Sequence, residues 1–271
     1  MALGWINPED YSFNAFLLFE RFAICRIIES SGFHNDETIW RYSRGVALNA
    51  NPVVMWYLKR RCPECAALVD EIAANAPTLT DAIEIRKAEK YALLGVEDHV
   101  LYTTPELMAE KGDFIRGWTQ ERLVDLADLT GKIVLDVAAG SGRLTCAAAE
   151  KAAWVYASEP AGTLREFMRD KISKEGIKNV RVLDGFALEL PFPDSTFDIV
   201  MSDHFCGGDY DEETAELSRV CKPGGWLLHC PSDSKYNHKL DNEKVVRGWE
   251  AIHYVGSYGN DVYCHRKQVR K

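Results

Sequence analysis

The chain has 271 residues, enough for one large domain or for a domain with a substantial extra module, and its 46% hydrophobic and 27% charged residues are typical of a globular protein. Its formal net charge of −9 argues against nucleic acid as a general partner, because phosphate binding needs a basic face. No stretch approaches the roughly 20 apolar residues that span a bilayer, and the N-terminus lacks a signal-peptide pattern, so we expect a cytoplasmic protein without a membrane span.

Residues 1–125 are predicted to be almost entirely helical. Residues 13–28 form an amphipathic helical pattern that Ser31-Gly32 closes, Thr80 is placed to cap a helix reaching Leu94, and residues 118–129 form a last helix. Three capping side chains followed by proline, each typical of a helix start, occur at Asn7-Pro8, Asn51-Pro52 and Thr104-Pro105.

The eight cysteines are expected to be reduced thiols, because no export signal precedes them. Cys62 and Cys65 form the only CxxC pattern of the chain. A zinc site built on this pattern needs a second ligand pair at similar spacing, and the sequence offers none. We therefore predict a structural role for the pair and no metal site, with zinc or redox chemistry as the alternative.

From Gly131 onward, short β-rich runs alternate with helical segments, which indicates βαβ units and a parallel sheet. We predict an α/β fold for residues 126–271, with a doubly wound, mostly parallel sheet of the Rossmann-like kind. The expected strands are Ile133–Ala138, Trp154–Ser158, Val180–Asp184, Phe197–Ser202 and Trp226–Cys230, and the expected helices are Arg143–Ala152, Thr163–Lys174 and Asp211–Cys221.

A glycine turn after the first strand carries the strongest functional signal. Gly140 and Gly142 stand where a buried strand runs into a helix, and glycine lets the backbone approach a ligand closely. Thr145 occupies the place of the third glycine of a dinucleotide-binding turn, and Asp136 lies inside the strand, four positions before Gly140. A carboxylate there would repel a pyrophosphate but would suit a ligand that carries an ammonium group. S-adenosylmethionine carries both an ammonium and a sulfonium.

A second acidic residue stands at the end of the second strand. Glu159 lies 17 residues beyond Gly142 and is placed to bind both hydroxyls of a ribose. NAD and S-adenosylmethionine share that requirement, so Glu159 indicates an adenosine-containing ligand without choosing between them.

Residues 133–230 resemble the class I methyltransferases, and particularly the type-11 group that includes the ubiquinone and menaquinone methyltransferases. The resemblance rests on the glycine turn and on three later motifs in the expected order: residues 184–194 (DGFALELPFPD), 195–200 (STFDIV) and 217–225 (LSRVCKPGG). It implies S-adenosylmethionine as the cofactor and methyl transfer to a small-molecule acceptor as the activity. The cofactor-binding residues that it implies are Asp136, Ala138, Gly140, Gly142, Glu159, Pro160, Gly185, Phe186, Ala187 and Ser202.

The chain departs from the family pattern at Phe186, where many relatives place an aspartate that receives the adenine amino group. Phe186 is expected to border the adenine ring, while the backbone N–H of Ala187 pairs with it. The alternative is that Phe186 belongs to the hydrophobic core.

The methyl acceptor is expected at the carboxyl end of the fourth strand, where open α/β sheets bind ligands. His204 is the candidate base there, because histidine titrates near neutral pH, and Asp203 is the residue that orients it or contacts the acceptor. A surface role for His204 is an equal alternative, and Cys206 is a weaker candidate nucleophile. Residues 1–125 are expected to form a cap that supplies the acceptor pocket.

Two other functions remain open from the sequence. An NAD-linked Rossmann oxidoreductase is disfavoured by Thr145 and Asp136. A regulatory protein that binds S-adenosylmethionine without catalysis is separated from an enzyme only by a product assay.

Overall fold

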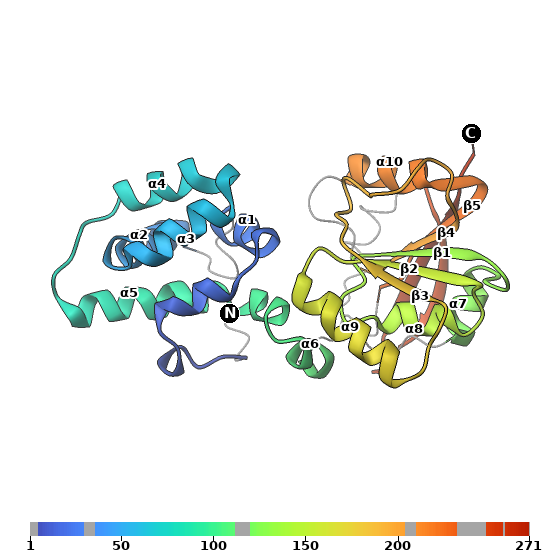
Figure 1. Cartoon of the computed structure of the whole chain (residues 1–271), viewed down its shortest axis with the longest axis horizontal. Helices are drawn as coiled ribbons and strands as arrows, with labels where there is room; N and C mark the ends of the chain where they lie inside the picture. Colours follow the sequence, from blue (N-terminus) through green and yellow to red (C-terminus); the bar gives the residue numbers. More distant parts are fainter. Residues whose placement is uncertain are drawn as a thin grey trace. The chain divides into compact units, whose positions relative to one another are not determined.

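The computed structural model describes residues 5–29, 36–111, 120–203, 210–231, 248–256 and 258–270, and the chain divides into two compact units, Met1–Thr104 and Pro105–Lys271 (Figure 1). This division lies earlier in the chain than the boundary expected near residue 125. The reason is that α6 (Pro105–Lys111) and α7 (Gln120–Leu126) pack against elements of the second unit, α6 on α9 and α7 on α8 and β7.

The described residues of the first unit form helices joined by turns and short irregular segments. Its core combines aromatic and aliphatic side chains from most of its helices, including Phe13, Phe16, Trp40 and Leu58. The 3-10 helices are η1 (Pro8–Asp10), η2 (Phe13–Leu18), η3 (Pro63–Cys65) and η4 (Glu97–Tyr102), and the α-helices are α1 (Arg21–Glu29), α2 (Glu37–Ala50), α3 (Pro52–Arg61), α4 (Ala66–Ala74) and α5 (Ala82–Leu94).

The helix starts follow the capping signals with two corrections. Asp81 caps α5 in place of Thr80, because its Oδ1 accepts hydrogen bonds from the backbone N–H groups of residues 83 and 84, at 2.8 and 3.4 Å. The amphipathic run 13–28 is broken after Leu18 into η2 and α1. Asn51 precedes α3 as expected, and the expected stop at Ser31-Gly32 lies outside the described residues. In the described parts of the chain, no helix is long and apolar enough to cross a membrane.

The second unit is built on a seven-stranded sheet with the order β3-β2-β1-β4-β5-β7-β6. Strands β1 to β5 are parallel, and β7 and β6 continue the sheet in the antiparallel sense. The strands are β1 (Ile133–Val137), β2 (Trp154–Ser158), β3 (Val180–Leu183), β4 (Phe197–Ser202), β5 (Cys221–His229), β6 (Glu250–Val255) and β7 (Asp261–Gln268), and the intervening helices are α8 (Arg143–Ala149), α9 (Gly162–Lys174) and α10 (Tyr210–Val220). The mostly parallel α/β fold is confirmed.

Helices cover both faces of this sheet (Figure 1). On β1, Val134 points into a core shared with α7, α8 and α9, whereas Leu135 and Val137 point into a core shared with α10. This alternation follows from the two-residue period of a strand, and it makes the unit doubly wound.

Two parts of the sheet differ from the expectation. β5 begins at Cys221 and not at Trp226, because Cys221 pairs with Phe197 before a register irregularity. The hairpin of β6 and β7 was not predicted from the sequence. Its edge strand β6 has no buried residue, so a hydrophobic pattern gave no signal for it.

The strand order reverses between β1 and β4, so their carboxyl ends flank the crevice in which open α/β sheets bind ligands. The buried hydroxyl of Ser202, at the end of β4, donates a hydrogen bond of 2.8 Å to the carbonyl oxygen of Val137, at the end of β1. This bond fixes the two strand ends against each other at the switch point.

Candidate functional site

The turn between β1 and α8 is held in a conformation that favours glycine. Gly140 and Gly142 have φ values of 55° and 78°, and Ala138 adopts a φ of 56°, which is rare for a residue with a side chain. A Cβ atom on Gly142 would lie 2.6 Å from Cγ of Met168 on α9. Gly142 is therefore needed for its backbone conformation and for the close packing of α9.

The carboxylate of Glu159 is bound to this turn. One oxygen accepts a hydrogen bond from the backbone N–H of Gly140 and the other from that of Ala161, both at 2.9 Å. Only 3% of Glu159 is exposed. A carboxylate has about four acceptor positions, so two remain for a ligand. The acid at the end of β2 thus lies beside the glycine turn, as the sequence spacing predicted.

Asp136 is buried in β1 and is paired with Thr145 of α8. The hydroxyl of Thr145 donates a 2.5 Å hydrogen bond to Oδ2 of Asp136. In the sequence, Thr145 was informative only because it replaces the third glycine of a dinucleotide-binding turn. The structure gives its side chain a role, because the hydroxyl orients the carboxylate.

Both acids have raised pKa values. Burial raises the pKa of Asp136 to about 7, the Thr145 hydrogen bond opposes the shift, and the negative charge of Glu159 adds to it. Burial also raises the pKa of Glu159 to about 7 against the effect of its two backbone N–H donors. Two buried acids with mutually unfavourable charges form a site that a cationic ligand would stabilise.

Arg165 of α9 supports the segment that follows β2, and sequence analysis missed it. Its Nη1 donates to the carbonyl oxygens of Glu159 and Pro160, at 2.7 and 2.8 Å, and lies 3.1 Å from Oδ1 of Asp184. The arginine therefore ties the ends of β2 and β3 together. A surface arginine on a helix carries no sequence signal for such a role.

Residues 185–187 follow β3 at the same edge of the sheet. A Cβ atom on Gly185 would lie 2.2 Å from Oγ of Ser158, so this position has no room for a side chain. Phe186 is 41% exposed, which excludes the alternative that it belongs to the core. Its carbonyl oxygen accepts a 2.9 Å hydrogen bond from the N–H of Glu189, and the partly buried Ala187 lies inside this turn.

The acceptor candidates are only partly described. Ser202 and Asp203 lie at the carboxyl end of β4, with Ser202 buried and Asp203 half-buried. His204 and Cys206 lie outside the described residues. One described residue from the expected cap does reach the site: Sδ of Met108 on α6 lies 3.5 Å from the position of a Cβ atom on Gly140.

Comparison with known proteins agrees with this geometry. Residues 134–225 match a family model described as a methyltransferase domain. An uncharacterised methyltransferase of Geobacillus kaustophilus is 32% identical over 48% of this chain and 62% of its own length. Demethylmenaquinone methyltransferases of Thermobifida fusca and Thermus thermophilus are 34% and 39% identical, over 49% and 40% of this chain and 56% and 51% of their own lengths.

The chain thus spans between 51% and 62% of the length of these relatives. A crystal structure described as a SAM dependent methyltransferase from Aquifex aeolicus superposes with a TM-score of 0.53 at 18% identity, over 62% of this chain and 98% of that one. That likeness shows the fold of the α/β unit.

Proposed function

We propose that this chain, whose α/β unit is a class I S-adenosylmethionine-dependent methyltransferase domain of the type-11 group, transfers a methyl group from S-adenosylmethionine to a small-molecule acceptor. The observation that carries the proposal is the pair of buried acids, Asp136 and Glu159, at the glycine turn. S-adenosylmethionine presents a ribose and two positive charges, and the two acids match these features.

Each cofactor-binding residue receives a role in this proposal. Glu159 accepts the two ribose hydroxyls with the acceptor positions that Gly140 and Ala161 leave free. Asp136 offsets the positive charge of the methionine part of the ligand. Phe186 borders the adenine ring, and Ala138, Gly142, Pro160, Gly185, Ala187 and Ser202 line the same edge of the sheet.

The oxidoreductase alternative fits the site less well. The pyrophosphate of NAD carries negative charge, and it would approach a turn where two acidic side chains are already buried. Thr145 also fills the third-glycine position and holds Asp136.

Calorimetric titration of the full chain with S-adenosylhomocysteine and with NAD tests the cofactor. We expect micromolar or tighter binding of S-adenosylhomocysteine and no response to NAD. The reverse pattern would assign the chain to the oxidoreductases.

For the transfer itself, we propose His204 as the base and Asp203 as the residue that orients it or contacts the acceptor. Methyl transfer from a sulfonium is an in-line displacement, so positioning and exclusion of water supply much of the rate, and a base matters only for acceptors that lose a proton. If His204 is the base, His204→Gln lowers the rate by about 100-fold and removes the acidic limb of the pH–rate profile. If the mutant keeps the pH–rate profile of the wild type, His204 is not the base, and catalysis rests on positioning of the acceptor.

The acceptor is to be sought in a panel of small molecules with a product assay by mass spectrometry. Demethylmenaquinone belongs in the panel because two relatives are named for it, although they align with less than half of this chain. A chain that binds the cofactor and methylates nothing would be assigned to the regulatory alternative. We propose a cytoplasmic location, where reduced cysteines are the expected state.

A further inference from the structure

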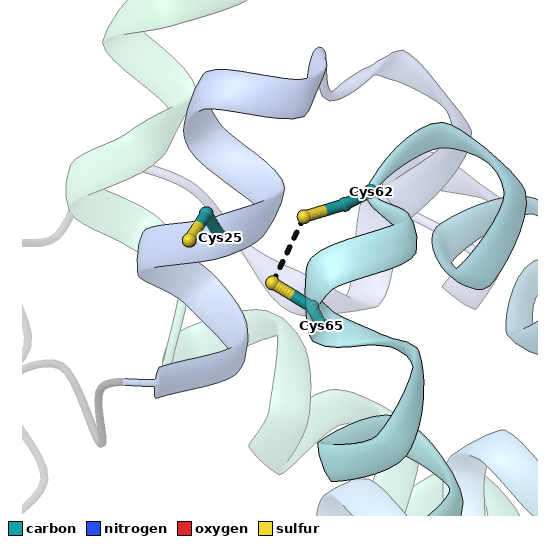
Figure 2. Close-up of side chains that lie close together, drawn as sticks. All are labelled: Cys25, Cys62 and Cys65. Atoms are coloured by element: carbon teal, nitrogen blue, oxygen red, sulfur yellow. Dashed lines mark hydrogen bonds between the residues drawn. The ribbon is translucent and has the colours of Figure 1, made fainter.

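Three cysteine thiols gather in the helical unit, and none of them belongs to a residue of the proposed methyltransferase site. Cys25 comes from α1, whereas Cys62 and Cys65 stand at the turn between α3 and α4 (Figure 2). The Sγ atoms of Cys62 and Cys65 are 2.8 Å apart, and all three Sγ atoms lie within 4.8 Å of one another. A third thiol, from 37 residues before Cys62 in the chain, therefore lies beside the CxxC, a proximity that the sequence spacing did not reveal.

The spacing of the three sulfur atoms suits a tetrahedral metal ion. Zn–S bonds are about 2.3 Å long, which places the sulfur atoms of a tetrahedral site about 3.8 Å apart. The Cys62–Cys65 separation of 2.8 Å is shorter than this value, and all three separations are below 4.8 Å, so small rotations of the side chains would reach it. CxxC is also the spacing by which two thiolates commonly chelate one zinc ion.

The surroundings distinguish this trio from a reactive redox centre. Cys62 and Cys65 are 0% and 4% exposed and belong to the apolar core of the helical unit. This burial limits their access to an external disulfide, whereas a metal ion supplies the positive charge that stabilises buried thiolates.

We infer that Cys25, Cys62 and Cys65 form a zinc site that clamps α1 to the junction of α3 and α4. Binding converts one Zn²⁺ and three neutral thiols into a tris-thiolate complex of charge −1 and releases three protons. A fourth ligand would come from water or from Glu29, which stands one turn further along α1 and interacts with the half-buried Cys25. The sequence prediction of no metal site is thereby replaced by this proposal.

The clamp would stabilise the helical unit, because Cys25 and the CxxC lie on separate helices that only tertiary packing holds together. Metal-binding energy at a structural site is available as folding energy. The inference is independent of methyl transfer, since no residue of the trio takes part in the cofactor site.

The test uses the full chain, purified under reducing conditions, stripped with a chelator and titrated with Zn²⁺ and with Cd²⁺. We expect one equivalent of Zn²⁺ by elemental mass spectrometry, a dissociation constant below about 0.1 µM, and a thiolate-to-Cd²⁺ charge-transfer band. In a weakly buffered solution near pH 7, each equivalent should release about three protons.

Cys25→Ser should lower the Zn²⁺ affinity by about 100-fold or more, as should Cys62→Ser and Cys65→Ser, because each removes a ligand. Cys146→Ser is the matched control: its thiol is also partly buried, but it lies on α8 of the other unit. Circular dichroism checks that each variant is folded, and the half-buried Cys25 provides the decisive variant if the CxxC variants do not fold.

Retention of wild-type affinity by Cys25→Ser would overturn the three-thiolate site and indicate adventitious binding. Equal loss in Cys146→Ser would do the same. A chain that binds no Zn²⁺ when reduced, and that loses two hydrogens at Cys62 and Cys65 on mild oxidation, would identify a redox pair instead.

Discussion

Glu159 combines a binding role with a structural one, and two substitutions separate them. Glu159→Ala removes the acceptor for the ribose together with the hydrogen bonds to Gly140 and Ala161. We expect S-adenosylhomocysteine to bind 10- to 100-fold more weakly, which corresponds to roughly 1.5–3 kcal/mol for a charge-assisted contact to two hydroxyls.

Glu159→Gln is the matched control, because its amide keeps one oxygen acceptor and loses the charge. Its affinity should fall between those of the wild type and Glu159→Ala in calorimetric titration. Unchanged affinity in a folded Glu159→Ala protein would place the ribose elsewhere.

The raised pKa values of Asp136 and Glu159 predict a pH dependence of ligand binding. Both groups have pKa values of about 7 in the free protein, so each is partly protonated at neutral pH. A cationic ligand favours their ionised forms, and binding should therefore release protons and become tighter as pH rises from about 6 to about 8. Calorimetry in two buffers of different ionisation enthalpy measures the protons released.

The same shifts predict the opposite trend for the stability of the ligand-free chain. The folded pKa values of the two acids lie above the unfolded ones. The acids therefore make their full contribution to the free energy of unfolding below about pH 4, and this contribution is lost as pH rises through about 7. Asp136→Asn, which keeps an acceptor for Thr145, should flatten this fall in melting temperature between pH 5 and pH 8. An identical slope in the mutant would contradict the assignment to Asp136.

At the scale of elements, the close packing of the glycine turn against α9 predicts how a substitution of Gly142 changes stability. Gly142→Ala should destabilise the chain by about 2 kcal/mol or more, since its Cβ atom would meet Met168 and its φ is positive. Gly176→Ala is the control, because Gly176 has a similar φ of 70° and no atom within 4 Å of the added Cβ. It should lose only about 1 kcal/mol, the cost of the left-handed backbone.

Denaturant unfolding followed by circular dichroism measures both free energies. Equal destabilisation of the two variants would mean that α9 moves aside without cost, and the turn would then tolerate a side chain.

The sheet shows why some elements were predictable and others were not. β1 and β4 each bury all but one of their residues and β2 buries three of its five, and their apolar runs alone identified them. β6 lies at the sheet edge, where pairing with β7 and not burial maintains the strand. Its sequence therefore shows no hydrophobic pattern from which a strand could be predicted. The cap of α5 was misplaced by one residue because Thr80 and Asp81 are both good capping residues and only the backbone geometry selects Asp81.

At the scale of the whole molecule, our proposal assigns cofactor binding to the α/β unit and acceptor recognition to the helical residues that precede it. A fragment of residues 105–271 keeps α6 and the entire sheet. We expect it to retain S-adenosylhomocysteine affinity within about tenfold and to lose methyl transfer, because the proposed cap is removed. The full chain, assayed with the same acceptor, is the control. If the fragment still methylates the acceptor, the helical unit does not form the acceptor pocket.

The sequence by itself determined the features that depend on neighbours along the chain. The glycine turn after β1, the acid at the end of β2 and the alternation of strands with helices are local patterns, and Gly140, Gly142 and Glu159 lie where that pattern placed them. Contacts between side chains on one element and residues on another were decided only by the tertiary structure: Thr145 on Asp136, Arg165 on the carbonyl of Glu159, and Cys25 beside Cys62 and Cys65. The pKa values of about 7 belong to the same class, because they arise from burial and from charges brought together in space, which one-dimensional spacing does not contain.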